Sequence, residues 1–219
     1  MRQQMIKGQL QPQKITDPDM LAAFGKVPRE MFIDLQFQIQ SYHDYDLRVY
    51  LDQSVRYLLS PRKLAKLFSF INFSHKPKIL IIGFATGYSL AIAYELGAKV
   101  YGIEENNLLF SFGQTALQHY FDAFYELTNF DDLLFIDQNK LSEGFPEHGL
   151  YDYILIEGGI EYIPDGLLEQ LRPHGQLISI YLNNPLGVFT CSKEGTIRHE
   201  TYEKAYPLMG FQKQKGFSL

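Results

Sequence analysis

Short apolar runs that alternate with helical segments constrain the fold of this chain more than any other feature of its sequence. The first run covers residues 79–82, a helical segment follows at 90–96 and ends at Gly97, and a second run covers 100–103. This order predicts a βαβ unit. Further strands are expected at 133–136, 153–156 and 177–181, with helices at 108–121 and 166–171. Strands that are apolar throughout and separated by helices predict an α/β fold whose mostly parallel, doubly wound sheet is covered on both faces.

The end of the sheet is predicted to differ from its centre. Residues 188–191 and 197–202 are apolar or β-branched in part, and they bracket the turn sequence Lys193-Glu194-Gly195. This pattern is typical of a β-hairpin. We therefore expect the sheet to end in antiparallel strands.

Residues 1–60 are predicted to form a small, mostly helical region. Asp17 followed by Pro18 is a helix-start signal, and the apolar residues Met1, Met5, Ile6 and Leu10 fit one stripe of an earlier helix. Residues 42–46 are rich in aromatic and acidic side chains and are expected to be irregular. A further helix is expected to begin at Ser60 and Pro61, with its buried face formed by Leu64, Leu67, Phe68 and Ile71.

Composition excludes several classes of protein. The hydrophobic share of 46% is enough for a full core, and the single cysteine, Cys191, cannot form an internal disulfide. A net charge of −5 without a basic stripe argues against a nucleic-acid partner, and the six dispersed histidines give no metal-site spacing. The apolar runs are shorter than the roughly 18 residues that cross a bilayer, and residues 1–10 lack the apolar stretch of a signal peptide. We expect a cytoplasmic protein with no membrane partner, and the oligomeric state stays open.

The turn after the first apolar run carries the chemistry. Gly83 and Gly87 lie between a predicted strand and a predicted helix, where the backbone can approach a ligand closely and the helix N-terminus offers free N–H groups. A dinucleotide fingerprint would need glycine at the positions of Ala85 and Tyr88. The methyltransferase spacing G-x-G-x-G is met at Gly83 and Gly87, with Ala85 in the middle. A nucleotide-like ligand is therefore predicted at this turn.

Glu104 is the predicted partner of that ligand's ribose. It ends the next strand, 21 residues after Gly83, where a carboxylate can accept bonds from both ribose hydroxyls. The alternative is that Glu104 is a surface acid beside an ordinary tight turn.

Several segments, taken together, resemble the protein-L-isoaspartate O-methyltransferases, which use S-adenosylmethionine. The matching segments are residues 1–6 (MRQQMI), 27–32 (VPREMF), the 83–88 loop, 151–156 (YDYILI) and 175–177 (GQL). The resemblance implies a Rossmann-like class I methyltransferase fold, with one domain over residues 1–219: a helical cap and substrate-side region at 1–60 and a Rossmann-like core at 61–219. It implies S-adenosylmethionine as cofactor and a protein or peptide carboxylate as substrate. It also assigns Gly83, Ala85, Gly87, Tyr88, Glu104 and Asp137 to the cofactor, Asp137 through adenine contacts unless it is a turn acid.

The substrate segment departs from the usual family pattern. Residues 56–61 read RYLLSP, the form of a divergent bacterial branch, and Leu59 stands where typical members carry a serine or threonine. Arg56, Tyr57 and Ser60 are the catalytic or substrate-site candidates by position. Ser60 competes for the role of helix N-cap, and Arg56 has the alternative of a surface ion pair. Ile81 and Ala85 likewise replace an acid and a glycine of typical members.

Three functions remain open from the sequence. The first is an S-adenosylmethionine-dependent O-methyltransferase that methylates a carboxylate of damaged protein. The second is a cofactor-binding relative with a different substrate, which Leu59 favours. The third is a non-catalytic relative, which Ile81 and Ala85 favour. A carboxylate nucleophile is ionised at neutral pH, so the absence of an acid–base dyad does not argue against methyl transfer.

Overall fold

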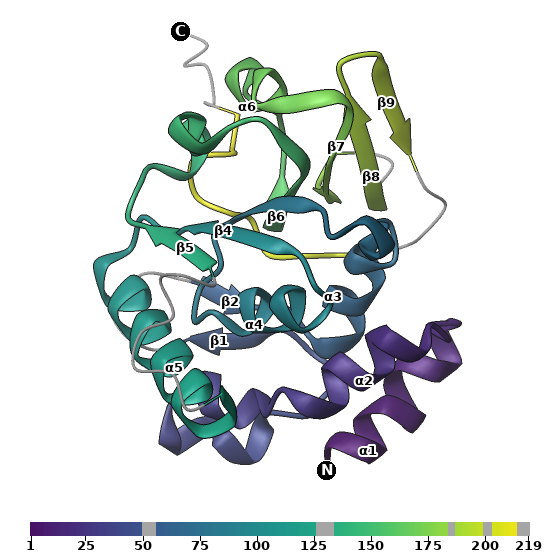
Figure 1. Cartoon of the computed structure of the whole chain (residues 1–219), viewed down its shortest axis with the longest axis vertical. Helices are drawn as coiled ribbons and strands as arrows, with labels where there is room; N and C mark the ends of the chain where they lie inside the picture. The colour runs from purple at the N-terminus through teal and green to yellow at the C-terminus, as the bar shows by residue number, and fades with distance from the viewer. Residues whose placement is uncertain (50–55, 126–133, 184–186, 199–202, 214–219) are drawn as a thin grey trace, which may run out of the picture.

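The computed structural model describes residues 1–49, 56–125, 134–183, 187–198 and 203–213. Within these ranges, the main sheet has seven strands in the order β5-β4-β3-β6-β7-β8-β9 (Figure 1). They are β3 (Lys78–Ile82), β4 (Lys99–Ile103), β5 (Leu134–Asp137), β6 (Tyr151–Ile160), β7 (Leu171–Tyr181), β8 (Gly187–Ser192) and β9 (Gly195–Arg198). The first five strands in this order, β5, β4, β3, β6 and β7, are parallel to one another. Strand β8 pairs antiparallel with β7, and β9 pairs antiparallel with β8. The predicted parallel sheet with an antiparallel end is confirmed.

The helices from α2 to α6 begin within two residues of the predicted starts. They are α1 (Arg2–Met5), α2 (Pro18–Lys26), α3 (Pro61–Phe68), α4 (Tyr88–Glu95), α5 (Asn107–Tyr125) and α6 (Asp165–Glu169). The Asp17 side chain accepts a hydrogen bond from the Met20 N–H at 2.8 Å, which confirms it as the N-cap of α2. Shorter π and 3₁₀ turns are Ile6–Leu10, Gln11–Gln13, Arg29–Phe32, Leu35–Gln40, Phe73–His75, Leu141–Glu143 and Pro146–His148.

Three details of the sequence prediction are wrong. The helix expected over 166–171 ends at Glu169, because Leu171 pairs with Tyr151 and so begins β7. Met1 is 74% exposed and does not belong to the buried stripe of Met5, Ile6 and Leu10. The region before α3 holds an antiparallel pair, β1 (Leu47–Val49) and β2 (Arg56–Leu58), which was not predicted because three-residue strands carry too little pattern. Residue 133 and residues 199–202 of the predicted strands lie outside the described residues.

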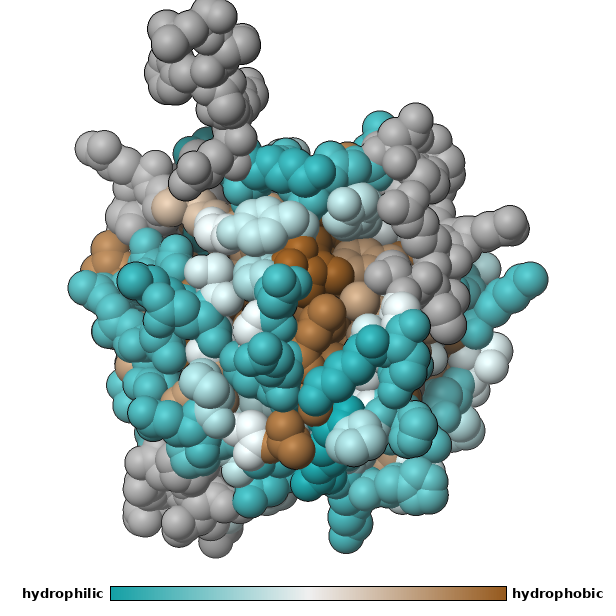
Figure 2. All heavy atoms as spheres, turned by 90° about the horizontal axis from the view of Figure 1, so that it is seen from above, coloured by the Kyte–Doolittle hydropathy of each residue, from teal (hydrophilic) through white to brown (hydrophobic). Residues whose placement is uncertain are grey.

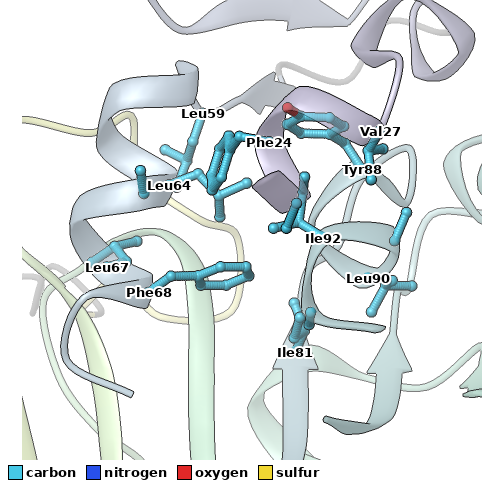
Figure 3. Close-up of a cluster of buried hydrophobic side chains, with 14 of the residues drawn as sticks. Phe24, Val27, Leu59, Leu64, Leu67, Phe68, Ile81, Tyr88, Leu90 and Ile92 are labelled. Carbon is cyan, nitrogen blue, oxygen red and sulfur yellow. The ribbon is translucent and has the colours of Figure 1, made fainter. Parts of the chain in front are cut away.

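The sheet separates the core into two halves. Ile79 and Ile81 of β3 face the half that contains the N-terminal region, α3, α4 and α5, whereas Leu80 and Ile82 face the half that contains α6. Figure 3 shows side chains of α2, α3, β3 and α4 converging in the first half. Seen from above, the surface is mostly hydrophilic, with a narrow hydrophobic band across its middle (Figure 2). No helix among the described residues is long and apolar enough to cross a bilayer.

Residues 203–213 form a segment that the sequence analysis did not assign, here called the C-terminal strap. It runs past the end of β6 (Figure 1, yellow). The Gly159 N–H donates to the Tyr206 carbonyl at 2.8 Å, and the Leu208 N–H donates to the Gly159 carbonyl at 2.9 Å. These bonds fix the strap across the carboxyl edge of the parallel sheet, the edge at which such sheets bind ligands.

Candidate functional site

The turn between β3 and α4 has the backbone that the glycine pattern predicts. Gly83, Ala85 and Gly87 all adopt positive φ angles, of 73°, 51° and 92°. Ala85 thus keeps a left-handed conformation that favours glycine, at a cost on the order of 1 kcal/mol for a residue with a Cβ. No side chain among the described residues caps α4, so its first backbone N–H groups remain available to an anionic ligand group.

Glu104 lies directly beside this turn and is fully buried. Its Oε2 accepts from the Ala85 N–H at 3.0 Å, and its Oε1 accepts from the Asn106 N–H at 3.2 Å. The alternative of a surface acid is therefore wrong. Burial raises the pKa of the Glu104 carboxyl, while the Arg56 guanidinium and the two amides oppose this rise. The contact of Glu104 with a ribose stays a prediction.

Arg56 is the unexpected neighbour of Glu104. Its Nη2 donates to Glu104 Oε2 at 2.7 Å and to the Gly83 carbonyl at 3.0 Å. The Arg56 side chain is only 7% exposed, so the alternative of a surface ion pair is wrong, and the pair is a buried one. The guanidinium joins β2 to the turn between β3 and α4. The predicted contact of Arg56 with a substrate carboxylate stays a prediction.

The C-terminal strap covers the same turn. A Cβ added at Gly158 would lie 2.8 Å from the Leu208 Cβ, and one added at Gly83 would lie 3.2 Å from the Leu208 methyl carbons. Glycine at these two positions therefore permits close approach by the strap. The Tyr206 ring stacks on Tyr57 with centroids 3.4 Å apart and an interplanar angle of 4°. Sequence reasoning missed these strap residues because an eleven-residue stretch without periodicity gives no signal.

Residues 59 and 60 serve the structure of the region. Ser60 is fully buried, and its hydroxyl accepts from the Lys63 N–H at 3.4 Å as the N-cap of α3. The Leu59 side chain points into the apolar cluster near Leu64 (Figure 3). The Leu59 carbonyl accepts from Arg29 Nη2 at 2.8 Å. The competing N-cap role of Ser60 is thus present, and a catalytic role for Ser60 stays a prediction.

The two remaining cofactor candidates are Tyr88 and Asp137, and the Asp137 carbonyl accepts from the Glu104 N–H at 3.2 Å. The Tyr88 side chain is buried against Phe24 and Phe32 and beneath the Arg29 guanidinium, so only the Tyr88 backbone belongs to the turn. Asp137 is exposed at the end of β5, and its Oδ1 accepts from the Gln138 N–H at 2.7 Å. This is the geometry of the turn-acid alternative, and an adenine contact through Asp137 stays a prediction.

A second buried carboxylate, Glu157, was not among the predicted site residues. It is 3% exposed, and its Oε1 has no hydrogen-bond partner among the described residues. Burial raises the pKa of Glu157 to about 7, although nearby Ser89, Arg56 and Arg29 favour the ionised form. The polar atoms of the described residues that are buried without a partner also include Arg29 Nε and Nη1, Arg56 Nε, Thr86 Oγ1, Tyr88 OH and Ser89 Oγ. Such a concentration of unpartnered polar atoms is expected at a binding site.

Comparison with known proteins identifies the family. The model of the family Protein-L-isoaspartate(D-aspartate) O-methyltransferase (PCMT) matches residues 1–205. The chain belongs to this family. A protein-L-isoaspartate O-methyltransferase of Christiangramia forsetii is 32% identical over 179 residues, which cover 81% of this chain and 77% of the relative.

Solved structures confirm the methyltransferase-type fold. One protein-L-isoaspartate O-methyltransferase structure matches with a TM-score of 0.76 at 19% identity and covers 94% of this chain, which in turn spans 66% of that structure. A putative enzyme of the same name from Plasmodium falciparum, solved with S-adenosyl-L-homocysteine, matches with a TM-score of 0.75 at 16% identity, covering 97% of this chain and 99% of that one. The family's methyl donor is S-adenosylmethionine.

The residues of the turn fit this cofactor. Among the described residues, Glu104 Oε1 accepts one hydrogen bond, from Asn106, which leaves acceptor capacity for a ribose hydroxyl without displacing Arg56. The uncapped start of α4 can receive a carboxylate. Among the described residues, no group of three or more His, Cys, Asp or Glu side chains could hold a metal ion.

Proposed function

We propose that the protein transfers the methyl group of S-adenosylmethionine to a carboxylate of a protein or peptide substrate, namely an isoaspartyl residue. The observation that carries the proposal is the left-handed turn from Gly83 to Gly87 with the buried Glu104 beside it, in a chain of this family. The turn and the carboxylate supply the parts that a nucleoside with an amino-acid tail requires.

The chemistry asks little of the protein beyond positioning. The bound cofactor supplies an electrophilic methyl group, and a substrate carboxylate is ionised at neutral pH, so no general base is needed. The protein's contribution is to hold the two groups in line and to exclude water. Glu104 and the α4 N-terminus would fix the cofactor, and the wall made by Tyr57 and Tyr206 would limit access to it.

Tyr57, Arg56 and Ser60 are assigned different roles under this proposal. Tyr57 lies on β2 and is half-buried, whereas Arg56 and Ser60 are buried. Of these three side chains, that of Tyr57 is therefore the one suited to contact a substrate. Arg56 holds Glu104 and the turn, and Ser60 holds the start of α3. Arg56 and Ser60 then act on the reaction through the residues they position.

The test is radiolabelled methyl transfer to an isoaspartyl peptide, with the aspartyl peptide of the same sequence as control. We expect transfer to the isoaspartyl peptide alone. Tyr57→Phe keeps a ring to stack on Tyr206 and removes the hydroxyl, so it should lower turnover without unfolding the protein. Absence of transfer by a folded protein that binds S-adenosylhomocysteine would refute the isoaspartyl substrate while leaving the cofactor assignment intact.

A second candidate function is methylation of a different carboxylate. The observation that favours it is Leu59, which places a core side chain where typical members place a hydroxyl. When a positioning contact is lost, a substrate misplaced by about 1 Å can react on the order of a hundred-fold more slowly. Transfer to intact protein extracts but not to isoaspartyl peptides would favour this candidate. A folded protein that binds no cofactor would leave only a non-catalytic role.

A further inference from the structure

Glu157 is a buried carboxylate of β6 that the predicted site did not include. In the parallel pairing of β3 with β6, Ile82 lies opposite Ile156, so Glu157 follows at the level of Gly83. Its neighbours include Ser89 of α4 and Arg29, so its side chain lies on the side of the sheet that α4 covers. Glu157 thus lies at the carboxyl edge of the sheet, beside the first glycine of the turn.

None of the groups that face Glu157 donates a hydrogen bond to its Oε1. They are Ser89 of α4, Arg56 of β2, Arg29 of the turn Arg29–Phe32, and Glu104 at the end of β4. Arg56 Nη2 is engaged by Glu104 and Gly83, and Arg29 Nη2 by the Leu59 carbonyl. The remaining buried nitrogens Arg56 Nε and Arg29 Nε and Nη1 make no hydrogen bond, to Glu157 or to any other described residue. Ser89 lies near the carboxylate but makes no hydrogen bond in this geometry, and Glu157 Oε1 remains without a donor.

A buried carboxylate with an unpartnered oxygen favours a cationic donor. Strand β3 offers no alternative carboxylate at this edge, because residues 79–82 are all apolar. S-adenosylmethionine carries two cationic groups, the sulfonium that donates the methyl group and the α-ammonium of its amino-acid end. Only the ammonium has N–H groups that can donate to Oε1.

Resting on the proposed function, we infer that Glu157 binds the α-ammonium of the methyl donor, while Glu104 serves the nucleoside end. The two carboxylates then divide the cofactor between them: Glu104 at the end of β4 and Glu157 on β6, on either side of β3. The positive start of α4 lies next to Ser89 and is suited to the α-carboxylate that adjoins the ammonium. The amino-acid end of the cofactor would thereby find complementary charges for both of its groups.

The test compares three ligands by calorimetry: S-adenosylmethionine, S-adenosylhomocysteine and methylthioadenosine, which lacks the amino-acid end. Glu157→Gln should weaken the first two by about ten- to a hundred-fold and leave methylthioadenosine within two-fold. Glu104→Gln should weaken all three. Glu169→Gln, an exposed acid at the end of α6, is the matched control and should weaken none.

Each other outcome overturns the inference in a recognisable way. Equal weakening of all three ligands by Glu157→Gln would mean a general structural role, and weakening of S-adenosylmethionine alone would place the sulfonium at Glu157. If Glu157→Gln does not fold, the wild-type protein still decides: its preference for S-adenosylhomocysteine over methylthioadenosine should rise at least ten-fold between pH 5.5 and 8, and a constant preference would refute the inference. A folded wild-type protein that binds none of the ligands would instead refute the proposed function.

Discussion

Replacement of Glu157 by glutamine is expected to make stability less sensitive to pH. Burial raises the pKa of Glu157 from the ordinary value of 4.5 to about 7. Between these values the folded state binds a proton that the unfolded state has lost, so the free energy of unfolding falls as pH rises. The cost is absent below the unfolded pKa and complete above the folded one.

The size of the effect follows from the pKa difference. Each pKa unit corresponds to about 1.4 kcal/mol, so the difference between 4.5 and about 7 gives a cost on the order of 3 kcal/mol at pH 8. Glutamine has nearly the same shape and cannot ionise. The stability of Glu157→Gln relative to the wild-type protein should therefore increase by about 2–3 kcal/mol between pH 4.5 and 8.

Urea unfolding followed by far-UV circular dichroism measures this difference at each pH, and the other titrating groups cancel between the two proteins. A Glu157→Gln difference that is constant within about 0.5 kcal/mol from pH 4.5 to 8 would show that Glu157 does not titrate in this range. That result would refute the buried, unpartnered carboxylate from which the ammonium site is inferred.

Three further predictions concern the segment 56–60 and its neighbours. Leu59→Ser restores the hydroxyl of typical members but removes a core side chain, so we expect a loss of about 2–5 kcal/mol in urea unfolding; a stable and more active variant would contradict this. Arg56→Met leaves Glu104 buried without its partner and should cost about 3–5 kcal/mol, most of which Glu104→Gln should recover in the double variant; simple additivity would argue against the pair. Tyr206→Ala should lower stability by at least about 1 kcal/mol through loss of the stack on Tyr57, while Tyr206→Phe stays near the wild-type midpoint; equal losses would place the contribution in the hydroxyl.

The sheet and the cofactor turn could be predicted because their signals are local. Apolar runs of four or five residues mark β3 and β4, and the glycine spacing marks the turn between β3 and α4. Asp17 and Ser60 as helix N-caps are equally local, since each side chain bonds a backbone N–H three residues ahead. Even the conformation of Ala85 follows from its place between two glycines of the motif.

The partners across the site could not be predicted, because they join segments far apart in the chain. Arg56 and Glu104 are 48 residues apart, and β2, which carries Arg56, has only three residues. Leu208 reaches Gly83 from the C-terminal strap, which has no periodic pattern. Glu157 directly follows the apolar residues 153–156 of β6, a pattern that gives no hint of an unsatisfied carboxylate.

We expect the strap to make cofactor affinity in this protein depend on Leu208, which lies beyond the family match that ends at residue 205. Leu208 is 3% exposed because it packs on Gly83 and Gly158. Arg56 Nη2 donates to the carbonyl of Gly83, so Leu208 and Arg56 contact the same residue. A ligand that contacts Gly83 must displace Leu208 from this glycine and expose part of its side chain. Full exposure of a leucine costs about 2 kcal/mol. Such a cost lowers affinity by about thirty-fold unless the ligand repacks Leu208 against itself. We therefore expect the strap to favour ligands with enough apolar surface beside their charged groups, a requirement that an adenosyl thioether meets and a free amino acid does not.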